Sequence, residues 1–396
     1  MNLLFILANV DSNKFQAIDV QDDIQMEDFE DSPVTRLSCF AHSVQLCVRD
    51  GLKNVPHMGK VLSKCQLLAK ISHKSSKIAD LLDEIDKRIN KMNITRWNSE
   101  YLLVKSILSI GKVDLETIGN LVETPVKFTK NDLVVLEEIV EILEPFYEIS
   151  IKCQGELPVT ASMVVPAVVH LLVHLRDMKG NLSYCNKFVI QLQSSLEKRF
   201  AGIINRLNQF VVKSNDPFND PVYFMATVLD PNFKLNWIRD LKLPVNSENR
   251  LKQNIIQLIL DEISKDLRTS TLLDGNNLSS SNSRKSSPSK AKKRKLFVYD
   301  NDDDHYSSSS ITVDPASELE IYLNDRTTIE FSNYWSHSRL ELLKNLVKRI
   351  FSVQASSAPV ERVFSYAGLI LSPRRTNISE ELFRDLVFLK VNQRLL

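Results

Sequence analysis

The spacing of hydrophobic residues along the chain predicts helices over most of its length. In the clearest case, apolar residues recur at intervals of three and four and predict a helix over 131–149. Thr129, with Asp132 three residues later, has the pattern of an N-terminal cap for this helix. The same spacing predicts further helices at about 36–52, 59–90, 188–211 and 250–267, and over most of 315–396.

One short segment near the start has the pattern of a strand. Residues 3–9, LLFILAN, form a compact apolar run that ends before Asp11. Only nine glycines occur among 396 residues, which favours helices over a turn-rich all-β fold. The composition, 43% hydrophobic and 25% charged, is that of a globular protein with room for two or three domains.

Cysteine use and hydropathy favour a soluble protein inside the cell. The five cysteines are odd in number, widely spaced and never form a C-x-x-C pair, which is typical of reduced thiols. The apolar start, MNLLFILANV, lacks the basic region and the cleavage site of a signal peptide. No run reaches the roughly 18 consecutive apolar residues that a membrane span needs. We therefore expect no membrane partner.

Residues 268–314 are too polar to bury a core, and we expect them to form a disordered linker. A basic cluster within this linker has two interpretations: a nuclear-import signal or nucleic-acid arm, or solvated charge balanced by the acidic residues 300–304. We favour the nuclear signal because the cluster is dense. Its residues are Lys290, Lys292, Lys293, Arg294 and Lys295.

Histidine and cysteine spacing gives little support for a metal site. His170 and His174 are four residues apart, but the glutamate of an H-E-x-x-H motif is absent, so core histidines are the favoured interpretation. Cys39 and His42 have C-x-x-H spacing without a second pair of ligands. We expect no zinc site.

The segment SSAPVERVFSYAG, residues 356–368, has the pattern of a helix start. Pro359 suits the first helical position, which would place Glu361 in the first turn, where a carboxylate meets the positive end of the helix dipole. From spacing alone, Glu361 is a helix-start residue. Apolar residues on the same helix would form a buried stripe: Val360, Val363, Phe364 and Ala367.

The same segment also resembles the C-terminal dimerisation region of the hAT superfamily of DNA transposases. The family's order is followed by Trp335, by the stretch 356–368, by Arg374 with Arg375, and by LVFLKVN at 386–392. Further blocks elsewhere in the chain resemble the family: LSCFAHSVQLCVRDGL at 37–52, NITRWNSEYLLVKSIL at 93–108, LEPFYEIS with LPVTASMVVPAV, and MATVLDPNFKLNW at 225–237.

The resemblance implies a ribonuclease-H-like sheet interrupted by a helical insertion, with two aspartates and a glutamate that bind Mg²⁺ or Mn²⁺ for DNA strand transfer. Several carboxylates suit two hard cations about 3.5–4 Å apart. Glu361 matches the family's glutamate, and Asp11 is the best match to its second aspartate, in a contracted motif. The first aspartate and the BED-type zinc finger find no match. We therefore expect an incomplete metal site, no bound cofactor and no catalysis.

DNA contacts are also implied by the resemblance. Trp97 matches a tryptophan that stacks near the transposon end, although a helix-packing role is an equal alternative. His42 matches a position beside the active site. Further DNA-binding candidates are Arg96, Arg374 and Arg375.

Together these expectations describe a mainly α protein with a partial α/β ribonuclease-H-like core interrupted by a large all-α insertion. The domains would be a core remnant at 1–52, an α-helical insertion at 53–267, the linker 268–314, and the dimerisation region 315–396, which completes the core. The predicted function is nuclear, through self-association and DNA binding, with no small-molecule substrate. The dimerisation candidates are Val363, Phe364, Leu382, Leu386 and Leu389, which could equally pack inside a monomer.

Two rival functions stay open. One is a fragment of an active, metal-dependent DNA transposase, whose first aspartate is encoded upstream. The other is a helical scaffold that makes no contact with nucleic acid.

Overall fold

The computed structural model describes residues 37–53, 55–91, 98–122, 125–155, 160–274, 314–327, 329–371 and 378–393, with side chains for all of these except 269–274. The chain divides into two units, Met1–Leu37 and Ser38–Leu396. Of the first unit only Leu37 is described, so the fold below is that of the second unit. The predicted strand at 3–9 lies outside the described residues, as do residues 275–313 of the linker predicted over 268–314. Residues 268–274, predicted as part of that linker, are helical instead.

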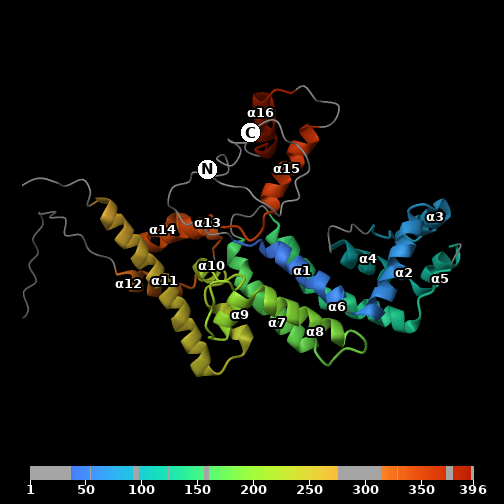
Figure 1. The fold of residues 1–396 in the computed structure, drawn as a ribbon, viewed down its shortest axis with the longest axis horizontal. Coiled ribbons are helices and arrows are strands. Elements are labelled where there is room, and N and C mark those ends of the chain that lie inside the picture. Colours follow the sequence, from blue (N-terminus) through green and yellow to red (C-terminus); the bar gives the residue numbers. More distant parts are fainter. Residues whose placement is uncertain are drawn as a thin grey trace, which may run out of the picture. The chain divides into compact units, whose positions relative to one another are not determined.

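Every regular element in the described part of the chain is a helix (Figure 1). The elements, including the short 3₁₀ helices η1 and η2, are α1 (Phe40–Lys53), α2 (Pro56–Ser72), α3 (Ser76–Glu84), α4 (Asn98–Leu108), α5 (Lys112–Asn120), α6 (Lys130–Cys153), η1 (Ala161–Met163), α7 (Val164–Met178), α8 (Asn186–Arg199), α9 (Ala201–Leu207), α10 (Val222–Leu229), η2 (Asn236–Leu241), α11 (Val245–Asp274), α12 (Pro315–Asn324), α13 (Phe331–His337), α14 (Glu341–Ile350), α15 (Ala358–Ile370) and α16 (Glu380–Val391). The mainly α prediction is confirmed. Because the described residues contain no strand, the predicted ribonuclease-H-like sheet is not confirmed.

The helix predicted at 131–149 is α6, and its predicted cap is present. The Asp132 backbone amide donates to Thr129 Oγ1 at 3.1 Å, and the Thr129 amide donates to Asp132 Oδ2 at 2.8 Å. This reciprocal pair is a capping box, which satisfies two amides at the helix start that have no helical partner. Lys64 of α2 also donates to Asp132 at 2.7 Å and joins α2 to α6.

The helical prediction over 188–211 is confirmed up to Leu207, but the chain breaks within this range into α8 and α9. Phe200 lies at the break with φ −117° and ψ 31°, outside helical values. Its fully buried ring lies 5.3 Å from the ring of Phe40 and 4.8 Å from the ring of Phe218, measured between centroids. Aromatic packing from distant parts of the sequence therefore overrides the local helical pattern.

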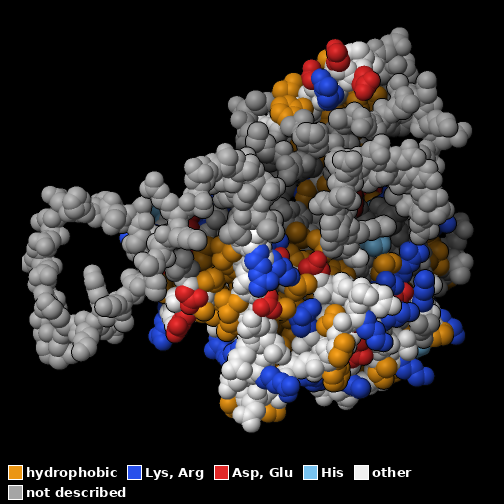
Figure 2. All heavy atoms as spheres, turned by 60° about the vertical axis from the view of Figure 1, so that its left-hand side comes forward, with side chains coloured by type: hydrophobic (Ala, Val, Ile, Leu, Met, Phe, Trp, Pro, Cys, Tyr) orange, Lys and Arg blue, Asp and Glu red, His pale blue; other side chains and the backbone are white. Residues whose placement is uncertain are grey.

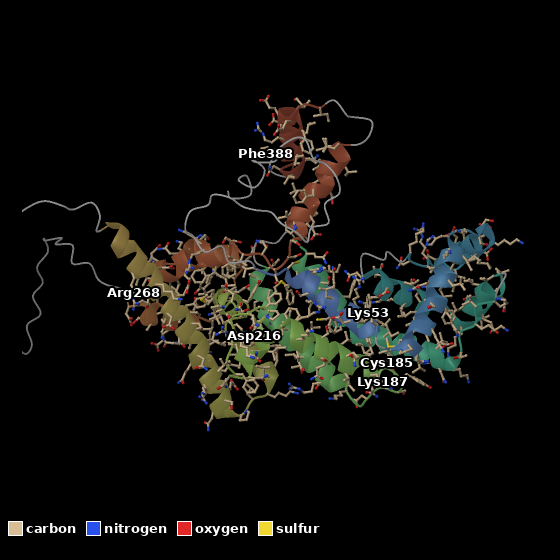
Figure 3. The ribbon with its side chains drawn as sticks, viewed as in Figure 1. Lys53, Cys185, Lys187, Asp216, Arg268 and Phe388 are labelled. Carbon is tan, nitrogen blue, oxygen red and sulfur yellow. The ribbon has the colours of Figure 1, made fainter. Side chains whose placement is uncertain are left out.

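Four helices surround a shared core, and each packs against two of the others: α1 on α8, α8 on α7, α7 on α6, and α6 on α1 (Figure 1). The α1–α8 contact is close, since a Cβ atom added at Gly51 would lie 2.9 Å from side-chain atoms of Leu192 and Phe188. Asp50 also joins these two helices by accepting from Ser195 Oγ at 2.8 Å and from Arg199 Nη2 at 2.6 Å. Figure 3 shows Lys53 and Lys187 at the adjoining ends of α1 and α8.

Two buried glutamates each cap the start of a different helix. Glu138 of α6 accepts from the amides of Ser183, Tyr184 and Cys185 at 2.6, 3.1 and 2.8 Å, just before α8 begins. Glu318 of α12 accepts from the amides of Leu342 and Leu343 at 3.1 and 3.2 Å, in the first turn of α14. Each carboxylate supplies charge-assisted hydrogen bonds at the positive end of a helix dipole.

The helices α12, α13 and α14 follow the undescribed residues 275–313 and complete the core around α10 and α11. Tyr322 Oη donates to Val228 O at 2.9 Å, and Trp335 Nε1 donates to Leu229 O at 3.0 Å. Lys234 Nζ donates to Tyr322 O at 2.8 Å and also to Asp325 O. These four hydrogen bonds join α12, its C-terminal end and α13 to the segment 225–237.

The helix α7 is the central apolar element. Together with η1 it gives an 18-residue segment, Ala161–Met178, that is long and apolar enough to cross a membrane by composition. However, 56% of this segment is buried inside the protein, as in the core helix of a globular fold. His174 Nε2 lies 3.2 Å from Ile142 O, and burial lowers the pKa of this histidine.

All five cysteines are free, as predicted. Burial raises the pKa of Cys47, Cys65 and Cys153 to about 12, so these thiols stay protonated at neutral pH.

Candidate self-association surface and the Glu361 cluster

The chain around residue 39 and the chain around residue 356 meet at the base of α15. The Phe40 amide donates to Ala355 O at 2.8 Å. Thr160, which is buried, accepts from the Ala355 amide at 3.0 Å and donates to Gln354 Oε1 at 2.9 Å. Two sequence blocks that resemble the hAT family are therefore neighbours in space, although more than three hundred residues separate them in the chain.

Glu361 lies at this junction as an exposed residue in the first turn of α15. Ser357 Oγ donates to Glu361 Oε1 at 2.7 Å. The amide and the hydroxyl of Ser357 also approach Cys39 Sγ, at 3.4 and 3.5 Å. Glu361 thus stabilises the start of α15, as its spacing predicted, and contacts a residue that contacts the block at 37–52.

No group of three or more metal-ligating side chains occurs within the part of the chain that the structure describes. His42 is an exposed residue of α1, two residues beyond the Phe40–Ala355 contact, and no described interaction joins it to Glu361. Asp11, the other predicted acidic ligand, lies outside the described residues. The vestigial metal site therefore stays a prediction.

Arg362 fastens α15 to the body of the protein. Its Nη1 donates to Gln154 O at 3.0 Å, at the C-terminal cap of α6. A cation at this position complements the negative end of the α6 dipole. The first turn of α15 is consequently held by α6 and by the residues around Cys39.

The buried stripe predicted for α15 is wrong. This helix contains no buried residue, and in α16 only Val387 is buried. The two helices pack against each other. The large hydrophobic residues that they leave exposed are Val360, Phe364, Leu369, Leu371, Leu382, Phe388, Leu389 and Val391. Figure 3 labels Phe388 in this pair, and Figure 2 shows hydrophobic side chains beside charged ones at the top of the view, where α15 and α16 lie.

The exposure of this pair is large for individual residues. Phe364 retains 60% of its accessible surface and Leu369 retains 74%. Of the five predicted dimerisation residues, Phe364, Leu382 and Leu389 are exposed, whereas Val363 and Leu386 are half-buried. Within the described residues, the apolar surface of α15 and α16 lacks a partner that would cover it. We call this pair the C-terminal hairpin.

The remaining candidate residues lie outside the described part of the chain, so the structure does not place them. They are Arg96, Trp97, Arg374, Arg375, Lys290, Lys292, Lys293, Arg294 and Lys295. Conversely, sequence reasoning missed Glu138, Glu318 and Lys234, whose partners are backbone groups. The block MATVLDPNFKLNW contains Lys234 but carries no sign that its ammonium group would bind carbonyls of α12 and its C-terminal end.

Comparison with known families agrees with the position of the hairpin. Residues 314–392 match the model of the hAT family C-terminal dimerisation region. The match covers two structurally different parts: the core helices α12, α13 and α14, and the exposed C-terminal hairpin.

Two known proteins are similar to the chain over stretches that are longer than the family match. Zinc finger BED domain-containing protein 4 of Homo sapiens is 20% identical over 377 residues, which are 90% of this chain and 29% of that protein. The Transposable element Hobo transposase of Drosophila melanogaster is 26% identical over 138 residues, which are 35% of this chain and 20% of that protein. The matched stretches cover less than a third of the length of either relative. The resemblance seen in the sequence is thereby confirmed: residues 314–392 match the hAT family C-terminal dimerisation region, and one of the two similar proteins is a transposase.

Proposed function

We propose that this chain is a transposase-derived protein that dimerises through its C-terminal hairpin and associates with DNA in the nucleus, without cleaving it. The observation that carries the proposal is α15, an apolar helix with no buried residue. Apolar side chains gathered on an exposed surface are typical of sites where another protein binds. A second copy of this chain is the occupant that the family match favours, because the matched region is a dimerisation region.

The arrangement of the exposed residues suits a helix-on-helix interface. Val360, Phe364 and Leu371 are four and seven residues apart, so they lie on one face of α15 or directly after it. Leu382 and Leu389, seven apart, share a face of α16. Two hairpins related by a two-fold axis could bury both faces at once, since such an interface brings the same patch together from each copy.

The proposal that the protein does not cleave DNA rests on the number of acidic residues that match the family's catalytic set. Glu361 and Asp11 are the only residues of this sequence that the resemblance assigns to the catalytic set, and Glu361 is hydrogen-bonded to Ser357. The rival interpretation, a fragment of an active transposase, predicts nicking of DNA in Mn²⁺ that Glu361→Gln abolishes. Incubation of supercoiled plasmid with the protein, with and without Mn²⁺, separates the two, because metal-dependent nicking would overturn the inactive assignment.

Nuclear location is supported by the basic cluster at 290–295 and by the kind of relatives that match. A fluorescent fusion of the full chain should accumulate in the nucleus. Replacement of the five basic residues of the cluster with Gln should disperse it. Unchanged nuclear accumulation would instead favour the interpretation of the cluster as solvated charge.

Light scattering coupled to size exclusion tests the dimer. The full chain should elute with about twice its 45.3 kDa monomer mass. Phe364→Glu and Leu382→Glu should give the monomer mass, because each places a charge in an apolar interface. Val211→Glu and Val245→Glu are matched controls, since both valines are exposed but lie outside the hairpin. A monomeric wild-type protein, or equal dissociation by the controls, would remove the support for a dimer through this surface.

A further inference from the structure

Charge is unevenly distributed along this chain, and the most basic described stretch surrounds α2. Residues 51–79 contain six lysines and no aspartate or glutamate, although the formal net charge of the whole chain is only +1. A segment of this length with 25% charged residues would normally carry both signs. The excess of lysines is therefore a local property of α2 and of its flanking residues.

The helix α2 places several of these lysines on one exposed face. Its buried residues, which face α1, α4 and α6, are Met58, Val61, Leu62, Cys65, Leu68, Ala69 and Ser72. Lys60 and Lys70 lie on the opposite face with Ser63 and Leu67, and Lys74 follows in the turn after the helix. All five of these residues are exposed. We call Lys60, Lys70 and Lys74 the α2 lysine row.

The α2 lysine row is not neutralised by neighbouring carboxylates. Among the described residues, no acidic side chain lies within ion-pairing distance of Lys60, Lys70 or Lys74. By contrast, Lys64 on the flank of α2 binds Asp132 at 2.7 Å and Lys127 O at 3.0 Å. The latter contact brings the backbone of Lys127 next to α2.

The chemistry of this face distinguishes between classes of partner. An interfacial membrane helix inserts its apolar face into lipid, but the apolar face of α2 is buried in the protein. Protein interfaces are depleted in lysine and enriched in aromatic residues, whereas the exposed face of α2 offers lysines and a single large apolar residue, Leu67. Unpaired ammonium groups on a rigid helix match the phosphates of a nucleic acid backbone.

We propose that the α2 lysine row binds the phosphate backbone of duplex DNA without reading its sequence. This proposal rests on the DNA association proposed above and assigns it to a surface. Ten residues separate Lys60 from Lys70, which is about 15 Å along the helix axis. At one phosphate per 3.4 Å along each strand, this length faces about four phosphates of one strand. Three lysines can therefore contact different phosphates at the same time.

Fluorescence anisotropy with a short labelled duplex of arbitrary sequence tests this assignment on the full chain. The triple variant Lys60→Gln, Lys70→Gln, Lys74→Gln removes the row. The matched control is Lys112→Gln, Lys198→Gln, Lys348→Gln, which removes the same charge from exposed lysines on other helices. Titrations at several salt concentrations give both the dissociation constant and its salt dependence. Circular dichroism melting of each variant verifies that the fold is unchanged.

The row variant should bind about tenfold or more weakly at low salt, and the slope of log K against log salt should fall by about 0.9 for each phosphate that is no longer neutralised. The control should lose clearly less affinity and keep its slope. Equal losses in both variants would mean that only total charge matters, and would overturn the proposal. An unchanged row variant would overturn the assignment to α2 while DNA association itself stands.

Two other outcomes would also overturn the proposal. Failure of the wild-type protein to bind any duplex would remove both this proposal and the DNA part of the proposed function, while the light-scattering test of dimerisation stays independent. Binding of the row to vesicles of phosphatidylserine and phosphatidylcholine, with no binding to the duplex, would assign the surface to anionic lipid instead.

Discussion

The two parts of the family-matched segment 314–392 have opposite relations to solvent. In α12 and α13, Tyr322 and Trp335 are buried and donate hydrogen bonds to carbonyls of α10, and Leu343 of α14 is buried as well. In the C-terminal hairpin, the similarly apolar α15 has no buried residue. Within this one region, some hydrophobic residues are therefore buried in the core and others are exposed. The first set completes the monomer, and the second set is available to another molecule.

This difference changes where the region should be divided in an experiment. Removal of the entire match would remove core side chains together with the exposed surface, so a loss of dimer would not show which part forms the interface. The useful boundary is between Ser357 and Ala358, where the core contacts of Thr160 and Ala355 end and α15 begins.

Two deletions should give the largest contrast. Deletion of 315–396 should prevent folding, because fully burying each large apolar side chain contributes about 1.5–3 kcal/mol and whole domains are stable by only about 5–15 kcal/mol. Deletion of 358–396 should leave a folded monomer that melts within a few degrees of the wild type. Circular dichroism melting and light scattering check both. Cooperative folding of the variant that lacks 315–396 would show that α12–α14 are not part of the core.

Substitution of two glutamates in the matched segment should give smaller losses of stability than the deletions. The loss should be larger for the buried glutamate of the core helices than for the exposed glutamate of the hairpin. Glu318→Gln should lower the free energy of unfolding by about 2–3 kcal/mol, since a buried charged acceptor for two amides of α14 is weakened. Glu361→Gln should lower it by at most about 1 kcal/mol, because Glu361 is an exposed residue at a helix start. Urea unfolding of both variants measures the two effects. Equal losses would contradict the division into anchored and exposed parts.

A similarly small effect is expected from the ion pair between α11 and α14. Burial opposes ionisation of Glu262, but hydrogen bonds from Lys265 and Arg349 outweigh it and lower the pKa of this carboxyl. Because the folded pKa is depressed, the pair contributes stability above the unfolded value of about 4.3 and loses it as pH falls through the folded value. Arg349 is half-exposed, so solvent weakens the attraction.

Glu262→Gln should therefore cost about 0.5–1 kcal/mol at pH 7, and this gap should close as the pH approaches about 3. Urea unfolding of wild type and variant across this pH range measures the gap. A gap that is constant with pH would mean that the contribution of Glu262 does not come from its charge.

Much of the helical fold could be predicted from local patterns, because a helix that packs on a core must repeat its apolar residues every three to four positions. The α6 helix and its Thr129 cap follow from that rule. The break at Phe200 could not be predicted, since it depends on rings that are far away in the sequence. Periodicity locates an apolar face without identifying what covers it, which is why α15 was expected to be buried.

The candidate site shows the same limit. The motif at 356–368 correctly placed Glu361 in a first turn, but its contact with Ser357, and through Ser357 with Cys39, required the fold. Glu138 and Glu318 could not be recognised either, because their partners are backbone amides that any residue could supply.

The contacts across residues 275–313 have an evolutionary consequence. Arg349 of α14 binds Glu262 and Asp266 of α11, so side-chain contacts join a helix that precedes residues 275–313 to a helix that follows them. For a flexible connection, each doubling of length adds only about 0.6 kcal/mol to the entropic cost of closure. Insertions and deletions at this point would thus be nearly neutral for folding, and new sequence signals could be gained or lost there while the helical body stayed intact.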